Sequence, residues 1–115
     1  MKQTKIWGTT QEIWTGNNVE FHRIDIATSG FCSKHCHDYK FNMFFVEQGE
    51  LWVDVWETAD EVNRTIIKTG ESTIIEPKKY HKFIAPIPTV AYEIYWVKLF
   101  KEDIIRETWG GVIHG

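Results

Sequence analysis

The stretch Lys34–Gly49, KHCHDYKFNMFFVEQG, places two histidines one residue apart directly before a dense apolar segment. Successive side chains of a β-strand point to opposite faces, so we expect His35 and His37 to project to the same side, about 6.6 Å apart along the backbone. Two imidazoles at this spacing can converge on one metal ion. The pair therefore predicts a metal site at the start of the apolar segment.

Two further residues extend this donor set. Asn42 lies five positions after His37, and His81 lies in the stretch Glu76–Phe83, EPKKYHKF, just after a proline-containing turn. Three imidazoles and one oxygen donor form a suitable ligand set for a divalent transition metal. We therefore expect one divalent ion, with Zn, Fe, Mn and Ni left open, held by His35, His37, His81 and Asn42.

The apolar residues of the chain recur with a period close to two, and Gly, Pro, Asn and Asp interrupt them every ten or so residues. This pattern is typical of a sandwich or barrel of short strands, so the predicted fold class is all-β. The expected strands are Glu12–Trp14, Val19–Ile26, Phe31–Cys36, Phe41–Glu47, Glu50–Glu57, Arg64–Lys68, Ser72–Ile75, His81–Ala85 and Ala91–Leu99. The one expected helical turn is Glu102–Arg106.

Length and composition limit the classes of protein that this chain can represent. A chain of 115 residues can build one core, so we expect a single domain over residues 1–115, with the metal-site core at about residues 30–98. The net charge of -3 and the lack of a basic cluster argue against a nucleic-acid partner. The first residues, MKQTKIWGTT, lack the apolar core of a secretory signal, and no apolar run reaches the roughly 20 residues of a membrane helix. A cytoplasmic protein without a membrane partner is expected.

Two pairs of residues bear on the redox state and on association. On an extended strand the α-carbons of Cys32 and Cys36 would lie about 13 Å apart, too far for a disulfide, so both thiols are expected to be reduced. In the strand after Gly49, Trp52 and Trp56 alternate with a core-facing aliphatic row. Outward tryptophans either pack under the N-terminal segment or form a subunit contact, and we expect a homodimer.

The order and spacing of the candidate ligands resembles the two sequence motifs of the cupin superfamily. The first motif is represented by Gly30, His35, His37, Asn42 and Gly49, and the second by Gly70, Pro77 and His81. The resemblance implies a cupin jelly-roll β-barrel that has room for one small-molecule ligand beside the metal.

The chain departs from the family pattern at Asn42, where cupins carry a glutamate. A neutral amide leaves the full charge of the metal uncompensated, which weakens retention of the ion but strengthens its Lewis acidity. Asn42 either binds the metal through its amide oxygen or donates its NH₂ group to a substrate or a bound water.

A wider resemblance is to the cupin domain of bacterial mannose-6-phosphate isomerases. It rests on the stretches KIWGTTQEIW, GESTIIEP and EDIIRETWGG, with the matching residues Trp7, Gly8, Gly70, Glu71, Ser72, Asp103, Ile104 and Arg106. This resemblance implies a metal-dependent protein that acts on or binds a sugar or sugar phosphate. In such an isomerase, a base near the metal moves a proton between adjacent carbons of the open-chain sugar.

Candidates for the proton-transfer groups are Glu93 and Tyr95, which share one face of the stretch AYEIYWVK. The alternative is that Glu93 pairs with a lysine and Tyr95 only packs. The candidates for substrate contacts are Phe44, Phe83 and Arg106. Two other classes stay open: a ferrous three-histidine dioxygenase-type cupin, and a ligand-binding cupin without turnover.

Overall fold

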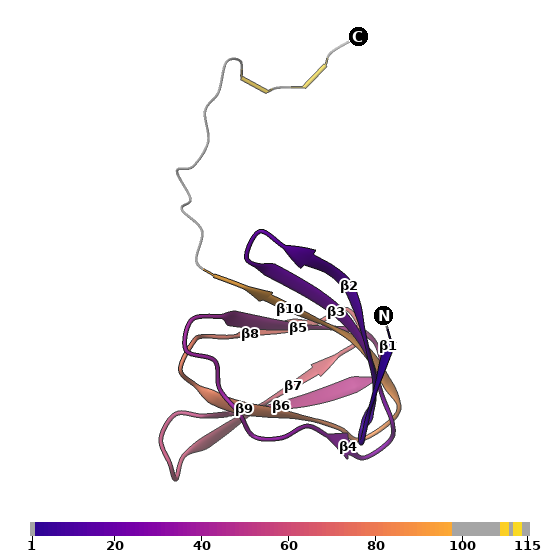
Figure 1. Ribbon diagram of the computed structural model, residues 1–115, viewed down its shortest axis with the longest axis vertical. Coiled ribbons are helices and arrows are strands. Elements are labelled where there is room, and N and C mark those ends of the chain that lie inside the picture. The colour runs from indigo at the N-terminus through magenta and orange to yellow at the C-terminus, as the bar shows by residue number, and fades with distance from the viewer. Residues whose placement is uncertain (1, 98–108, 111, 114–115) are drawn as a thin grey trace.

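A computed structural model describes residues 2–97, 109–110 and 112–113 of the chain. These residues form ten β-strands and no helix, and the strands build two antiparallel sheets that face each other (Figure 1). The all-β prediction is confirmed. Within the described part of the chain, there is no helix with the length and apolar character of a membrane span.

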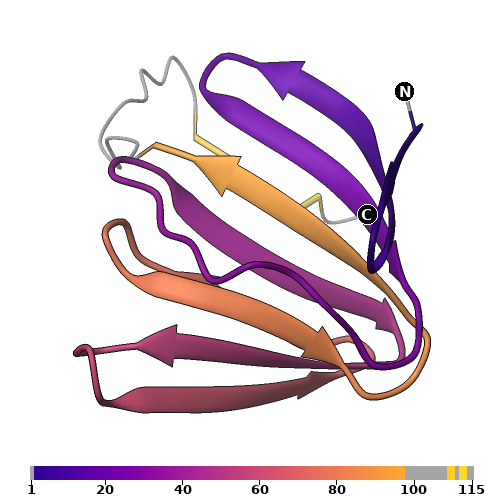
Figure 2. The same cartoon turned by 60° about the horizontal axis from the view of Figure 1, so that its bottom comes forward.

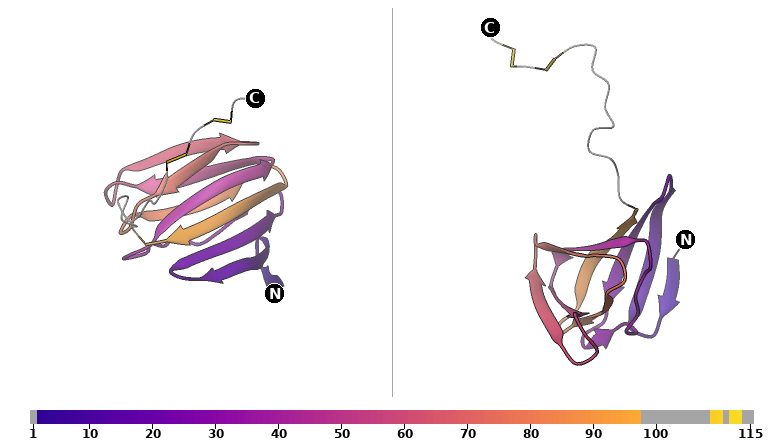
Figure 3. Two further views of the ribbon diagram at one scale, coloured as in Figure 1. Left: turned by 90° about the horizontal axis from the view of Figure 1, so that it is seen from above. Right: turned by 90° about the vertical axis from the view of Figure 1, so that its left-hand side faces the viewer.

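The larger sheet has six strands in the order β1-β2-β3-β10-β5-β8, and the smaller sheet has four in the order β4-β9-β6-β7. The strands are β1 (Lys2–Lys5), β2 (Gly8–Gly16), β3 (Val19–Ile26), β4 (Gly30–Phe31), β5 (Phe41–Gln48), β6 (Glu50–Trp56), β7 (Val62–Lys68), β8 (Ser72–Ile75), β9 (Tyr80–Ala85) and β10 (Thr89–Trp96). Figure 3 shows the N-terminal hairpin of β1 and β2 at one edge of the larger sheet.

The expected jelly-roll is not closed into a barrel, because the two sheets form an open sandwich (Figure 2). Among the described residues, every ladder joins strands of the same sheet. The chain changes sheets through turns, for example around Gly70, whose amide donates to the Val46 carbonyl oxygen at 2.8 Å. The polar groups of this turn are thus satisfied by β5, and no described strand belongs to both sheets.

Most expected strands agree with the structure to within a few residues, and Val19–Ile26 and Ser72–Ile75 agree at both ends. The expected strand Phe31–Cys36 is wrong, because the ladder ends at Phe31 and only an isolated bridge at His35 follows. The polar strand Lys2–Lys5 was not expected, since it lacks an apolar alternation and is held only by its pairing with β2. The expected turn Glu102–Arg106 and the last residues of Ala91–Leu99 lie outside the described residues.

The core lies between the two sheets and is built from the inward-facing residues of both. Phe44 on β5 and Phe83 on β9 are each 1% exposed, and their rings meet edge to face with centroids 5.8 Å apart. Trp7, in the turn after β1, packs its ring against Phe83 at 5.0 Å. The N-terminal segment therefore covers the core with Trp7.

Both tryptophans of β6 are covered by cations, one from β7 and one from the segment between β4 and β5. The Arg64 guanidinium lies 4.6 Å from the Trp52 ring centroid, and the Lys34 ammonium lies 4.2 Å from that of Trp56. Arg64 also forms a two-pronged ion pair with the buried Asp54, at 2.8 and 3.0 Å. These cation–π contacts stabilise the two rings at the outer face of the sheet. Neither packing under the N-terminal segment nor a subunit contact is therefore needed to shield Trp52 and Trp56 from water.

The turn between β5 and β6 depends on Gly49, which has a φ of 111°. A methyl group at this position would overlap the Thr89 hydroxyl and lie 2.8 Å from the Pro88 carbonyl oxygen. The same hydroxyl accepts a hydrogen bond from the Glu50 amide at 3.1 Å and donates to its carbonyl oxygen at 2.9 Å. The motif glycine is thus explained by both backbone conformation and close packing.

Candidate metal centre

The structure brings His35, His37 and His81 together, with one nitrogen of each ring within 4.8 Å of the others. His35 and His37 belong to the segment between β4 and β5, whereas His81 lies on β9. Two backbone hydrogen bonds join these segments: the His35 amide donates to the His81 carbonyl oxygen at 3.1 Å, and the His81 amide donates to that of His35 at 2.8 Å. The ring centroids lie 4.5 to 5.5 Å apart.

Two of the three imidazoles are oriented by the main chain. His35 Nδ1 lies 2.7 Å from the Ser33 carbonyl oxygen, and His81 Nδ1 lies 3.0 Å from that of Lys79. Since a carbonyl oxygen only accepts, each Nδ1 carries the proton and each Nε2 keeps a free lone pair. Backbone carbonyls orient metal-binding histidines in this way.

Three buried polar atoms in this region have no hydrogen-bond partner among the described residues: Nε2 of His37, Nε2 of His81 and Oδ1 of Asn42. An unpaired buried acceptor costs free energy, so such groups are retained where a ligand or an ion uses them. All three atoms can donate a lone pair to a cation. The donor set therefore fits a divalent transition metal.

The pKa values of His37 and His81 are consistent with metal binding. Burial and, to a smaller extent, the neighbouring His35 and His37 together lower the pKa of His81 to about 4, although a hydrogen bond to Lys79 opposes the shift. Burial also lowers the pKa of His37, and His35 adds to this effect. Both rings are neutral near pH 7, which is the form that binds a metal.

Asn42 lies on β5, is 1% exposed, and faces the same interior as Phe44. It is the direct cross-strand partner of Tyr95, whose ring contacts that of His37 at 5.2 Å between centroids. Its amide nitrogen donates weakly to the Met43 carbonyl oxygen at 3.5 Å. The amide oxygen is thus the free end of the side chain, beside the histidine cluster.

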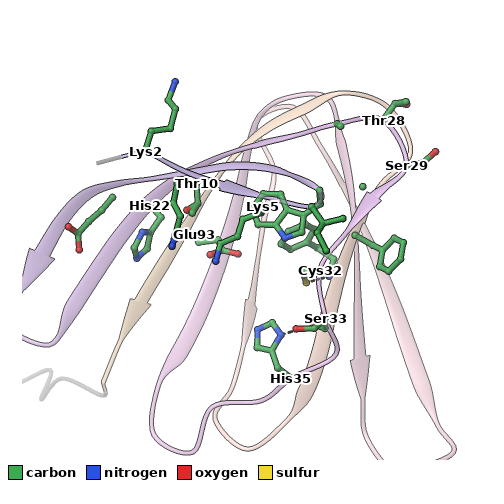
Figure 4. Close-up of a pocket in the computed structure, with 18 of the residues that line it drawn as sticks. Lys2, Lys5, Thr10, His22, Thr28, Ser29, Cys32, Ser33, His35 and Glu93 are labelled. Atoms are coloured by element: carbon green, nitrogen blue, oxygen red, sulfur yellow. Dashed lines mark hydrogen bonds between the residues drawn. The ribbon is translucent and has the colours of Figure 1, made fainter.

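A cavity of about 1140 Å³ adjoins the histidine cluster at His35 (Figure 4). Its walls come from the N-terminal hairpin, from the inner face of the larger sheet and from the segment that precedes the histidines. Among the predicted site residues, His35, Phe83, Glu93 and Tyr95 line it. Phe44 belongs to the core behind Phe83, and Arg106 lies outside the described residues.

Glu93 and Tyr95 form a hydrogen-bonded pair in the cavity wall, in which the Tyr95 hydroxyl donates to Oε2 of Glu93 at 3.0 Å. Burial raises the pKa of Glu93 to about 7, although the hydrogen bond from Tyr95 and the charge of Lys5 oppose the shift. Burial, with the adjacent Glu93, raises the pKa of Tyr95 as well. Glu93 can therefore take up and release a proton near neutral pH while Tyr95 stays protonated, and the Tyr95 ring contacts that of His37.

The lysines around His81 do not gather at the cavity. Lys79 pairs with Glu57 at 2.9 Å, and Lys82 lies over the Phe31 ring at 5.5 Å. Lys78 is in a turn, with a φ of 70°.

Several polar residues of the cavity were not among the predicted site residues. They are Lys5 at the end of β1, Thr10 and Glu12 on β2, and His22 on β3. Glu12, His22 and Glu93 are direct cross-strand partners on three neighbouring strands. The alternation within Val19–Ile26 puts His22 on the side of Ile24, but only the strand pairing places it beside Glu93.

The chain was compared with known proteins and solved structures. No protein-family model and no curated protein matches the sequence. Among solved structures, KdgF from Halomonas sp. has a TM-score of 0.71 at 13% identity, covering 86% of this chain and 89% of that chain. An RmlC-like cupin from Shewanella frigidimarina has a TM-score of 0.68 at 17% identity, covering 89% and 86%.

A third similar structure is an oxalate decarboxylase from Bacillus subtilis with Mn(II) centres. It has a TM-score of 0.75 at 11% identity, and the match covers 90% of this chain but only 29% of that one. At such identities the likeness concerns the fold alone. The fold of this chain is therefore the cupin fold, and the resemblance to mannose-6-phosphate isomerases is not found among these matches.

Proposed function

We propose that this protein is a metal-dependent cupin that binds a small polar molecule in the cavity beside His35. The observation that carries the proposal is the convergence of three imidazoles, two of which have a buried Nε2 without a partner among the described residues. His35, His37 and His81 would hold the ion, with Asn42 Oδ1 as the fourth protein donor. The Mn(II) centres of the oxalate decarboxylase with a similar fold support a metal of this class.

When bound, a divalent ion supplies a Lewis acid that polarises a carbonyl or hydroxyl oxygen of the ligand. A donor set of imidazoles and one amide adds no negative charge, so it favours ligands that bring oxygen atoms of their own. A sugar, a sugar phosphate or a small hydroxy acid has this chemistry.

Within this proposal, Glu93 and Tyr95 carry out isomerase-like proton transfer. The Glu93 carboxylate accepts a proton from the hydroxyl-bearing carbon next to a carbonyl group and returns it to the former carbonyl carbon, while the hydroxyl proton passes to the former carbonyl oxygen, so that atoms and charge balance over the cycle. A pKa of about 7 suits both halves of this task. Tyr95 holds Oε2 of Glu93 and leaves Oε1 for the ligand.

The experiment that tests the proposal is elemental analysis of untagged protein prepared without a chelator. Close to one equivalent of Zn, Fe, Mn or Ni per chain is expected, and it should fall on dialysis against a chelator. Absence of bound metal, together with no uptake from added salts, would contradict the proposal. A turnover assay with aldose and ketose phosphates then separates an isomerase from a binding protein, and oxygen uptake by an iron-loaded form would identify the dioxygenase class.

We also propose that the protein is a homodimer, through a surface other than the one that the sequence suggested. On the outer face of the larger sheet, five apolar side chains are consecutive cross-strand partners: Trp14, Phe21, Ile94, Met43 and Ile74. Parallel rows contain Val19, Trp96 and Phe41 on one side, and Tyr92 and Phe45 on the other. Trp14 is 49% exposed and Ile74 is 55% exposed.

The size of this face supports a subunit contact. Five neighbouring strands span about 19 Å, and three rows span about 14 Å along the strands, which is the scale at which exposed apolar patches mark interaction sites. A second copy would offer the same apolar face, as a two-fold interface requires.

A further inference from the structure

Outside the histidine cluster, the cavity has a second group of polar side chains at its opposite end. Figure 4 shows His35 and Ser33 at one end, and Lys5, Thr10 and His22 with Glu93 at the other. Thr10, His22 and Glu93 come from β2, β3 and β10 of the larger sheet, and the Lys5 side chain extends toward them from the end of β1 (Figure 4). A ligand that fills the cavity would therefore meet both ends.

Lys5 is a basic residue of the cavity wall, and no described carboxylate forms an ion pair with it. Arg23, Lys40, Arg64 and Lys79 each have an acidic partner within 3.4 Å, whereas no ion pair of Lys5 is found among residues 2–97. Its side chain turns into the cavity in Figure 4, and its charge acts on Glu93.

One carboxylate oxygen of each nearby acidic side chain is already hydrogen-bonded. Oε2 of Glu93 accepts the hydrogen bond from Tyr95 at 3.0 Å, and the Glu12 carboxylate accepts one from the Thr15 hydroxyl. The Lys5 ammonium is thus a cationic donor at the cavity that has no ion-pair partner among residues 2–97 and can bond to a ligand.

We propose that the cavity binds its ligand at two points, and that Lys5 supplies the second point as a specificity-determining residue for a terminal carboxylate or phosphate. The ligand class is a polyhydroxylated chain with an anionic group at one end. Its hydroxyl or carbonyl oxygens face the histidine cluster, and its anionic group lies beside Lys5 and His22. This inference rests on the proposed function for the histidine end, but the Lys5 end can be tested separately.

The test uses three probes that share one six-carbon hydroxylated chain: D-glucitol without charge, D-gluconate with a carboxylate and D-glucitol 6-phosphate with a phosphate. Their affinities are measured by titration calorimetry on the full chain, both metal-loaded and metal-stripped. A charge-assisted contact predicts that at least one anionic probe binds about tenfold or more tightly than glucitol. The stronger of the two anions identifies the group that Lys5 selects.

Lys5→Met keeps the length of the side chain and removes its charge. It should reduce the preference for the anion to less than about threefold and leave the affinity for glucitol unchanged. Lys68→Met, which makes the same change on β7 of the other sheet, is the control and should keep the preference. Melting temperature and metal content establish that both variants are folded.

Equal affinities for the three probes, or a Lys5→Met protein that retains the preference, would overturn the inference. A preference that depends on Lys5 in a protein that takes up no metal would support the anion site and contradict the proposed metal function. Loss of metal uptake in Lys5→Met would instead show that Lys5 acts through the histidine cluster, which also overturns the inference.

Discussion

The main chains of His35 and His81 are hydrogen-bonded to each other in both directions, at 3.1 and 2.8 Å. This isolated bridge fixes two candidate ligands that lie far apart in the sequence, and their ring centroids are 4.5 Å apart. The position of one ring thus depends on the backbone of the other. The site is held by the main chain, so a side chain can be removed without removing its support.

The first prediction concerns the metal ligands. Replacing His81 with alanine should lower the metal content by at least about tenfold, because one of three imidazoles is lost while the backbone bridge stays. His22→Ala is the matched control, since His22 lines the cavity that adjoins the cluster at His35 but lies outside the cluster. Elemental analysis of both variants checks this, and full metal occupancy in His81→Ala would rule out the assignment.

The second prediction concerns Asn42. Asn42→Glu should tighten metal retention against a chelator, because a carboxylate replaces an uncharged oxygen donor and neutralises part of the metal charge. Unchanged retention with weaker binding of ligand would instead place the amide in contact with the ligand, since an ionised glutamate cannot donate a hydrogen bond. Competition with a chelator, followed by a thermal-shift screen of hexose phosphates, distinguishes the two outcomes.

The third prediction follows from the pKa of Glu93, which is raised from its usual value of 4.5 to about 7. Because the folded protein favours the protonated form of Glu93, this carboxyl group contributes fully to the stability of the fold below about pH 4.5. The contribution is lost as the pH rises through about 7. The glutamine of Glu93→Gln cannot ionise, so the variant does not lose this stability at high pH. The difference in the free energy of unfolding, variant minus wild type, should therefore be larger at about pH 8 than at about pH 4.5, by on the order of 2 kcal/mol.

Urea denaturation at the two pH values measures this difference. Glu61→Gln, an exposed change on a turn, is the control and should show no such pH dependence. A difference between Glu93→Gln and the wild type that does not change with pH would mean that Glu93 is not held in a protonated form.

The fourth prediction concerns the outer face of the larger sheet. Ile94→Arg puts a charge in the middle of the apolar row and should convert a dimer into a monomer, because a buried unpaired charge is costly. Ile66→Arg, at a residue of β7 that is 50% exposed, makes the same change on the other sheet and should leave the mass unchanged. Light scattering at micromolar concentration gives both masses, and a monomeric wild type would reject the dimer.

The fifth prediction concerns two glycines of the cupin motifs and separates the effect of backbone strain from that of steric overlap. Gly49 and Gly70 have φ angles of 111° and 85°, but only at Gly49 would a methyl group collide with its surroundings. Gly70→Ala should therefore cost about 1 kcal/mol of backbone strain, and Gly49→Ala about 2 to 3 kcal/mol from strain and overlap together. Equal losses in thermal or urea unfolding would mean that the contacts with Thr89 and Pro88 relax freely.

Local patterns in the sequence were sufficient for much of the fold and for the histidine cluster. The alternation along Val19–Ile26 and Ser72–Ile75 follows from strand geometry, which depends only on neighbouring residues. The spacing of His35 and His37 also predicted that both side chains project to the same side, although the two residues lie in a segment with a single bridge and no continuous strand. The free state of both cysteines was confirmed as well.

The sequence by itself determined the all-β class, the turn at Gly49 and the residue types of the candidate metal site, because each depends on local backbone geometry or on donor chemistry. The tertiary structure decided which distant residues share a space. Strand pairing across the larger sheet put His22 beside Glu93, and packing covered Trp52 with Arg64. The tertiary structure also left the two sheets open at their edges. These features depend on the free energies of long-range pairing and packing, which no short stretch of sequence contains.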